Sequence, residues 1–244
     1  MKYKVYLSTK IKPSTLKQGS GIMVLEPDDY SAAEIKAIKK KGYKVLGYLS
    51  VGTIEKERTW YKTYSKYALK TLKDWPNEKY ADVRKTNWRV FLVNRAKAIK
   101  KKGFDGWWCD NLDVYEYYKS VKMFAACKAV LKAIKSIGGY LMVNGGSEFW
   151  DDVMDKKVNL KTIVNGVTQE EVFSLIKSYK GKGTFGKQKK TEGDFYKKLL
   201  KKLMSRGVGA FLLEYTRDES VKKSIKDWCS KNGASYYISE GVNL

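Results

Sequence analysis

The sequence contains no histidine. This absence excludes Ser-His and Cys-His catalysis, together with every metal site that relies on an imidazole ligand. The three cysteines, Cys109, Cys127 and Cys229, are widely spaced and form no CxxC pair. Neither a disulfide framework nor a zinc site is therefore expected, and the three are predicted to be buried free thiols. Carboxylates, tyrosines, asparagines and lysines remain available for chemistry.

Long apolar runs are also missing. No window approaches the roughly 20 apolar residues of a membrane span, and residues 1–4 do not begin a signal peptide. As it stands the chain is predicted to be cytoplasmic, whereas a trimmed leader would make it extracellular or attached to the cell surface. No linker rich in Pro, Gly or Ser divides the 244 residues. Residues 1–244 are therefore interpreted as one domain, and a monomer is expected.

Acidic residues are few beside the basic ones, with 26 Asp and Glu against 49 Lys and Arg, for a net charge of +23. Such a balance can indicate nucleic-acid binding. However, arginine, which suits phosphates and base edges, is sparse, and lysines gather at the ends and outer faces of expected helices, as in residues 39–41 and 100–102. Nucleic acid is therefore not expected as the main ligand, and attraction to an anionic cell-surface polymer is kept open as an alternative.

A lysine-rich stretch followed by glycine and an apolar run recurs at residues 36–43, 97–104 and 132–140, with looser copies at 203–213 and 228–238. Each copy predicts a helix whose last turn carries cations, a left-handed glycine stop and then a strand. The five junctions indicate repeated units in which a helix leads into a strand.

Eight short apolar runs bounded by turn residues are predicted to be strands. They are Tyr3–Leu7, Gly21–Leu25, Lys44–Leu49, Gly106–Cys109, Tyr140–Val143, Thr162–Val164, Ala210–Leu213 and Ser235–Ile238. Helices are expected between them, including 119–136, 169–178, 192–206 and 219–231. This alternation predicts an α/β fold, a (β/α)₈ TIM barrel.

Polar residues follow the predicted strands, at the end of a parallel barrel where βα loops build active sites. They are Glu26, Ser50, Asp110, Asn144, Asn165 and Glu214. We expect them to line one cleft. The alternative is that helix caps and turns explain them, since Asn144-Gly145 and Asn165-Gly166 are also common turn sequences.

Two carboxylates with separate roles are enough to cleave a glycosidic bond, and they need no metal or cofactor. Aromatic residues make up 14% of the chain and could stack on sugar faces. Glycoside hydrolysis is thus the favoured chemistry. A catalytically inactive barrel that binds carbohydrate and a basic nucleic-acid-binding protein are the alternatives.

Four ordered segments, residues 45–52, 80–83, 103–113 and 165–173, together resemble the endo-α-1,4-polygalactosaminidase-like glycoside hydrolases. The resemblance spans nearly the whole chain. It implies a TIM-barrel hydrolase that cleaves internal bonds of a galactosamine-containing polysaccharide. A de-N-acetylated polymer of this kind is cationic and would be repelled by a +23 surface, so an acetylated or anionic glycan would suit the charge better.

The resemblance places the family's catalytic aspartate at Asp110 and its catalytic acid at Glu170 instead of Glu171. Which of the pair is the acid, and which the nucleophile or base, stays open at this point. Simpler alternatives are that Glu170 is a helix N-terminal carboxylate and that Asp110 is an N-cap. The side chains expected to bind sugar around the pair are Glu26, Tyr48, Ser50, Asn144, Asn165, Glu214 and Tyr215.

Overall fold

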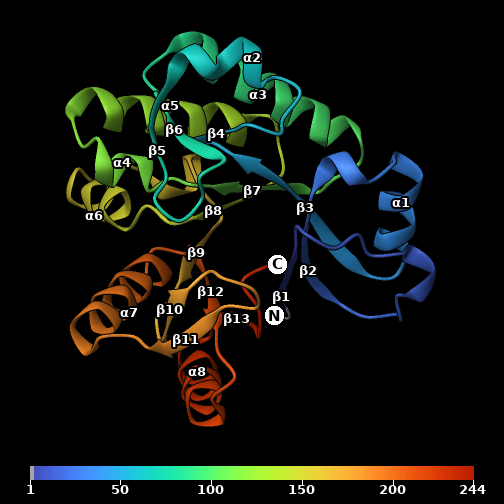
Figure 1. The fold of residues 1–244 in the computed structure, drawn as a ribbon, viewed down its shortest axis with the longest axis vertical. Coiled ribbons are helices and arrows are strands. Elements are labelled where there is room, and N and C mark those ends of the chain that lie inside the picture. Colours follow the sequence, from blue (N-terminus) through green and yellow to red (C-terminus); the bar gives the residue numbers. More distant parts are fainter. Residues whose placement is uncertain (1–2) are drawn as a thin grey trace.

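Eight parallel strands form one curved sheet in the computed structural model, which describes residues 3–244 (Figure 1). The strand order is β1-β2-β3-β7-β8-β9-β12-β13. The strands are β1 Tyr3–Tyr6, β2 Gly21–Leu25, β3 Tyr43–Ser50, β7 Gly106–Asp110, β8 Tyr140–Asn144, β9 Gly166–Glu170, β12 Gly209–Tyr215 and β13 Ser235–Ser239. The two edge strands of the sheet, β1 and β13, contact each other through side chains, with the rings of Tyr3 and Tyr237 centred 6.4 Å apart. The predicted (β/α)₈ barrel is confirmed.

Helices cover the outside of the sheet. They are α1 Ala32–Lys40, α2 Tyr61–Tyr64, α3 Thr86–Lys101, α4 Val114–Tyr117, α5 Val121–Ser136, α6 Ser147–Asp155, α7 Lys190–Met204 and α8 Glu219–Asn232. The five predicted helix-to-strand junctions are confirmed, because the glycine in each has a positive φ that other residues rarely adopt. These glycines are Gly42, Gly103, Gly138, Gly207 and Gly233.

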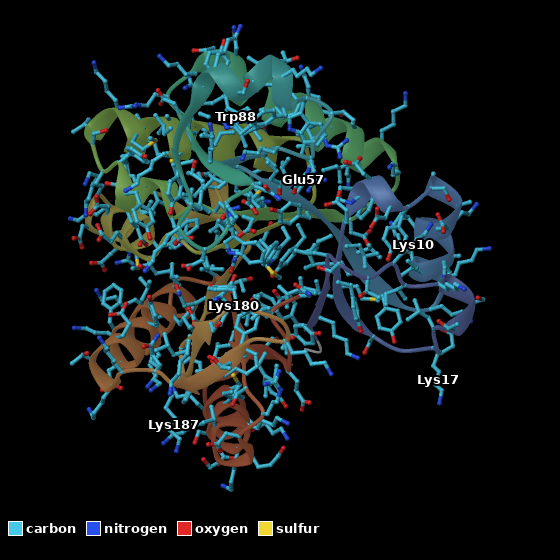
Figure 2. All side chains as sticks on the ribbon, viewed as in Figure 1. Lys10, Lys17, Glu57, Trp88, Lys180 and Lys187 are labelled. Atoms are coloured by element: carbon cyan, nitrogen blue, oxygen red, sulfur yellow. The ribbon has the colours of Figure 1, made fainter. Side chains whose placement is uncertain are left out.

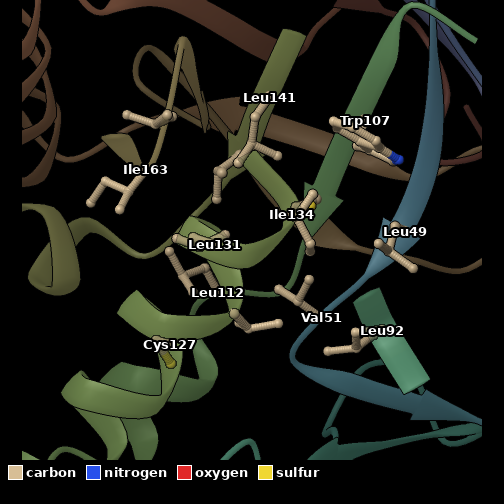
Figure 3. Close-up of a cluster of buried hydrophobic side chains, with 14 of the residues drawn as sticks. Leu49, Val51, Leu92, Trp107, Leu112, Cys127, Leu131, Ile134, Leu141 and Ile163 are labelled. Carbon is tan, nitrogen blue, oxygen red and sulfur yellow. The ribbon is translucent and has the colours of Figure 1, made fainter. Parts of the chain in front are cut away.

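Alternation along each strand separates two cores. Figure 3 shows the outer core, where Trp107 and Leu141 of the sheet pack against Leu92 of α3 and Ile134 of α5. Trp108 points the other way, into the barrel, where it joins Met142, Phe211 and other inward side chains. Because side chains alternate along a strand, each inward residue fixes which residue at the strand's carboxyl end also faces inward.

Two predicted elements are wrong. Residues 162–164 form no strand; Leu160–Thr162 is a 3-10 helix, and the sixth barrel strand is β9, which runs from Gly166 to Glu170. Residues 169–178 form no helix, because Glu171 takes a positive φ of 55° and the chain then enters β10, Ser174–Ser178, which pairs with β11, Thr184–Lys187. The apolar run Val172–Ile176 suits a strand as well as a helix, so its short pattern misled the prediction.

Two more departures concern helices. The connection from β1 to β2 holds a 3-10 helix, Pro13–Thr15, as its one helical segment among the described residues. Helix α6, which follows β8, was not predicted. After β3 the chain also adds a three-stranded antiparallel sheet, β4-β6-β5, at Thr53–Glu55, Glu78–Ala81 and Ala68–Thr71.

The exterior carries the excess of lysine. Lys10, Lys17 and Lys187 lie on the outside of the fold in Figure 2 and are exposed. Attraction of this surface to an anionic cell-surface polymer stays open as an alternative. The three cysteines are buried free thiols, as predicted. Within residues 3–244 no helix is both long and apolar enough to cross a membrane.

Candidate active site

The last residues of three neighbouring strands meet inside the barrel mouth. Asp110 ends β7, Asn144 ends β8 and Glu170 ends β9. Each lies two positions after a side chain that faces into the barrel. Two of those preceding side chains are joined by a hydrogen bond from Trp108 Nε1 to Thr168 Oγ1 at 3.0 Å. Strand alternation therefore turns all three polar side chains toward the same space.

The amide of Asn144 connects the two acids. Its Nδ2 donates to Asp110 Oδ1 at 2.9 Å and to Glu170 Oε1 at 2.6 Å. Tyr215 OH donates to Glu170 Oε2 at 2.8 Å. The two bridged carboxyl oxygens can be no farther apart than the sum of the two Asn144 bonds. The predicted pair from distant parts of the chain is thus brought together.

A tight loop holds Asp110 in place. The Asn111 backbone N–H donates to Asp110 Oδ1 at 2.8 Å, with Asn111 at a positive φ of 64° that asparagine tolerates. Asn111 Nδ2 in turn donates to Ser50 Oγ at 3.0 Å. Gly52 passes so close that a Cβ there would lie 1.7 Å from the Asn111 carbonyl oxygen. Asp110 therefore belongs to a fixed strand–loop corner, and it does not cap α4, whose N-cap position is held by Asp113.

Burial sets the protonation of the two acids. The pKa of Asp110 is raised to about 7, chiefly because the side chain is buried and next because the charge of Glu170 lies beside it. The pKa of Glu170 is also raised to about 7 by burial, against hydrogen bonds from Asn144 and Tyr215 that lower it. Two adjacent carboxyl groups with such pKa values hold about one shared proton near neutral pH.

The pair lies in a cavity of about 310 Å³. Seven carboxyl side chains line it: Glu26, Glu55, Glu57, Glu78, Asp110, Asp113 and Glu170. Arg58 is the one cationic side chain in that lining among residues 3–244. The interior of this basic protein's pocket is therefore acidic. Within residues 3–244, no three Cys, Asp or Glu side chains are grouped so that they could hold a metal ion.

Arg58 organises one side of the pocket. It pairs with Glu26 at 2.9 Å and with Glu55, and Glu55 accepts a hydrogen bond from Tyr48 OH at 2.9 Å. Burial alone would lower the pKa of Arg58, but these two carboxylates raise it overall. Glu78 lies opposite Glu55 in the β4–β6 ladder, and burial together with the Glu55 charge raises the pKa of Glu78 to about 7.

Two hairpins approach each other over the pocket. Trp75, in the loop between β5 and β6, and Tyr179, which follows β10, both line the cavity. Their rings meet edge to face with centroids 5.4 Å apart, and Trp75 is 43% exposed. The hairpins come from the upper and lower halves of Figure 1. No motif in the sequence places Glu55, Glu78, Trp75 or Tyr179 at the site.

The predicted binding residues divide into two groups. Glu26, Tyr48, Asn144 and Tyr215 line the cavity. Ser50 does not, because its hydroxyl is buried against Thr53 and Asn111 and positions the loop.

Two further predictions of binding residues are wrong. Asn165 precedes β9 and lies at the amino end of the barrel, where its Oδ1 accepts from Leu141 N at 2.8 Å. The side chain of Glu214 points out of the barrel, because its neighbours in β12, Leu213 and Tyr215, face into the barrel. Its fully buried carboxylate accepts hydrogen bonds from the backbone N–H groups of Val172, Phe173 and Ser174, so it anchors the loop after Glu170.

Glu214→Gln is expected to lower the free energy of unfolding by about 2–3 kcal/mol, because the new NH₂ group would face buried N–H donors that lose their acceptor. Urea denaturation measures this change. Glu240→Gln, a matched substitution on an exposed residue that pairs with Lys222 at 2.6 Å, should alter stability by less than about 1 kcal/mol, because exposed ion pairs contribute little. Equal stability of Glu214→Gln and the parent protein would contradict the anchoring role.

Solved structures of two other proteins share this fold. The glycoside hydrolase domain of PelA from Pseudomonas aeruginosa matches with a TM-score of 0.79 and 18% identity, covering 99% of this chain and 98% of that one. Ega3 of Aspergillus fumigatus, solved in complex with galactosamine, matches with a TM-score of 0.74 and 18% identity, covering 100% and 92%. At these identities the likeness concerns the fold.

Two sequence relatives are uncharacterized proteins. One from Methanocaldococcus jannaschii is 24% identical over 238 residues, which are 87% of this chain and 65% of that protein. One from Thermotoga maritima is 22% identical over 117 residues, 46% of this chain and 36% of that protein. This chain thus spans less than two thirds of either relative. The profile of one glycoside-hydrolase family matches residues 2–240, which is nearly the whole sequence. The resemblance noted in the sequence is therefore confirmed, and the chain belongs to glycoside-hydrolase family GH114.

Proposed function

We propose that this protein hydrolyses internal glycosidic bonds of a galactosamine-containing polysaccharide, with Asp110 and Glu170 as the catalytic pair. The observation that carries the proposal is the Asn144 bridge, which holds two carboxyl groups side by side in one acidic cavity. Membership of a glycoside-hydrolase family supports the reaction type. Two carboxyl groups with pKa values near 7 supply one proton donor and one ionised partner at neutral pH.

The short spacing supports a retaining mechanism. Retaining glycosidases hold their carboxyl groups about 5–5.5 Å apart, whereas inverting enzymes need roughly 6.5–9.5 Å to admit a water. Bonds of 2.9 and 2.6 Å to one nitrogen keep the two bridged oxygens, Asp110 Oδ1 and Glu170 Oε1, closer together than the inverting spacing. The nucleophile in such an enzyme forms a covalent bond to the sugar.

Asp110 fits the role of nucleophile. Its Oδ1 accepts from Asn111 and Asn144, while Oδ2 accepts from no group within residues 3–244 and is free to attack the anomeric carbon. As that bond forms, Glu170 gives its proton to the leaving glycosidic oxygen. Glu170 then takes a proton from water, whose oxygen attacks the anomeric carbon and releases Asp110 as a carboxylate.

The pocket's charge supports an amino sugar. The net charge of +23 argued against a cationic polymer, but the lysines lie outside and carboxyl groups line the cavity. An ammonium group entering beside Glu57 would meet an acidic cavity lining in a partly enclosed space, where screening by salt is weaker. Ega3, of the same fold, was solved with galactosamine.

The test is digestion of galactosamine polymers with graded N-acetylation, followed by reducing-end assay and ¹H NMR. The expected result is cleavage of the de-N-acetylated polymer to oligomers, with the first released ends retaining the substrate's anomeric configuration. Glu57→Gln should raise KM for that polymer several-fold and leave KM for the acetylated form unchanged, because the variant removes only charge. Equal effects on both polymers would contradict the charge argument. Inverted product would contradict the assignment of Asp110 as nucleophile.

A further inference from the structure

We propose that Asn144 is the positioning residue of the catalytic pair, acting as the amide donor that fixes the spacing of Asp110 and Glu170. This inference deepens the proposed function and rests on it. It gives Asn144 a different role from the sugar-binding one expected from the sequence.

Both N–H bonds of the Asn144 amide are directed at acids. One reaches Asp110 Oδ1 at 2.9 Å and the other Glu170 Oε1 at 2.6 Å. Its Oδ1 is buried and accepts no hydrogen bond from the described residues, and the whole residue is 4% exposed. The amide orientation is therefore set by the two carboxyl groups, since a flipped amide would place its oxygen against both of them.

The strand that carries Asn144 makes this bridge rigid. β8 lies between β7 and β9 in the sheet, and Asn144 pairs in register with Thr168 of β9, two residues before Glu170. The side chain thus rises between the two acids from a fixed backbone. A donor on a strand holds its partners more precisely than one on a loop, and a displacement near 1 Å can cost about 10²-fold in rate.

The same two bonds act on protonation. Burial raises the pKa of both acids, and the hydrogen bond from Asn144 is the foremost effect in the opposite direction for each. A donor to a carboxylate stabilises its ionised form. Without the amide N–H groups, both acids would hold their protons to higher pH. The ionised nucleophile would then be scarcer at neutral pH.

The test compares Asn144→Ala with Asn144→Asp in the full chain. The second variant keeps the shape of the side chain, so it separates loss of the donor from loss of volume if the alanine variant folds poorly. Titration of the ¹³C-labelled carboxyl groups by NMR should show the midpoints of Asp110 and Glu170 moved to higher pH in both variants, and further in Asn144→Asp because a third carboxyl group adds its charge. The acidic limb of the kcat profile should move in the same direction, with kcat at pH 7 lowered roughly 10 to 100-fold and KM changed little.

Asn159→Asp is the matched control. Asn159 lies before the 3-10 helix at Leu160–Thr162, and its Oδ1 accepts from Lys161 N, a bond that aspartate can also accept. It introduces the same charge away from the pocket and should leave both midpoints in place. Unchanged midpoints in Asn144→Ala, or a KM effect without a kcat effect, would overturn the inference. Because the titration needs no substrate, a parent protein that cleaves nothing would contradict the proposed function and still leave this role of Asn144 measurable.

Discussion

Asp110→Asn and Glu170→Gln should each abolish the release of reducing ends from de-N-acetylated galactosamine polymer, with kcat at least about 10³-fold below the parent value. Asparagine cannot form the glycosyl ester at a useful rate, so the first variant loses the nucleophile. Glutamine has no acidic proton for the leaving oxygen, and general acid catalysis alone contributes about 10²–10⁴-fold. Both substitutions preserve side-chain shape, so the cavity should persist.

The measurement pairs turnover with binding. Polymer affinity, measured by calorimetry, should stay within a few-fold of the parent protein in both variants, and Asp227→Asn, on an exposed residue of α8, should keep full turnover. Unchanged turnover in either active-site variant would remove that residue from the mechanism. A parent protein that binds polymer without cleaving it would favour the inactive carbohydrate-binding barrel. DNA affinity that falls steeply with salt, without glycan binding, would favour a nucleic-acid-binding protein.

The architecture is predictable from the sequence because the fold repeats a local signal. A helix that ends in lysines and a glycine appears before β3, β7, β8, β12 and β13, and each of those glycines takes the left-handed conformation. This signal lies within about eight residues and depends on backbone geometry and the helix dipole, so no long-range contact is needed to read it. This signal is missing before β9. Residues 158–165, which lead into β9, contain no glycine that ends a helix, and the predicted strand lies a few residues too early there.

The orientation of Glu214 is not predictable from the end of its apolar run, because that end does not show which residues of the strand face inward. Choosing the first polar residue after an apolar run selects Asp110 and Asn144 correctly, since Trp108 and Met142 face inward. In β12 the inward residues are Leu213 and Tyr215, so Glu214 must point outward. Which alternate residues of a strand face into the barrel is seen only in the packed structure. A strand that is apolar on both faces does not show it in the sequence.

The acidic side of the pocket was beyond prediction for another reason. Glu55 and Glu78 are far apart in the sequence and meet through an antiparallel sheet added after β3. Their neighbours give no sugar-binding motif, and lysine-rich composition pointed away from a cationic substrate. Charge counted over a whole chain says little about charge inside one cavity, because each sign can be placed on a different surface.

The activity of the protein should follow a bell-shaped pH profile centred near pH 7. The pKa of both Asp110 and Glu170 is raised to about 7, so the pair carries one proton around neutrality, and this form has both an ionised nucleophile and a protonated acid. As the pH falls, the second proton neutralises Asp110. As the pH rises, Glu170 loses the proton needed by the leaving oxygen. Outside the two macroscopic pKa values the rate should change about tenfold per pH unit.

The acidic limb is the decisive part of this profile, because the polymer's amino groups stay charged there and only the enzyme titrates. Activity near pH 4 should be roughly 10³-fold below the maximum if the nucleophile titrates near 7. An ordinary exposed aspartate, with a pKa near 4, would leave the enzyme almost fully active at pH 5. The measurement is kcat from reducing-end release between pH 4 and 9, with circular dichroism to verify folding. A flat profile down to pH 5 would show that burial does not hold a proton on this pair, and the two-carboxylate site would then need a different pair of acids.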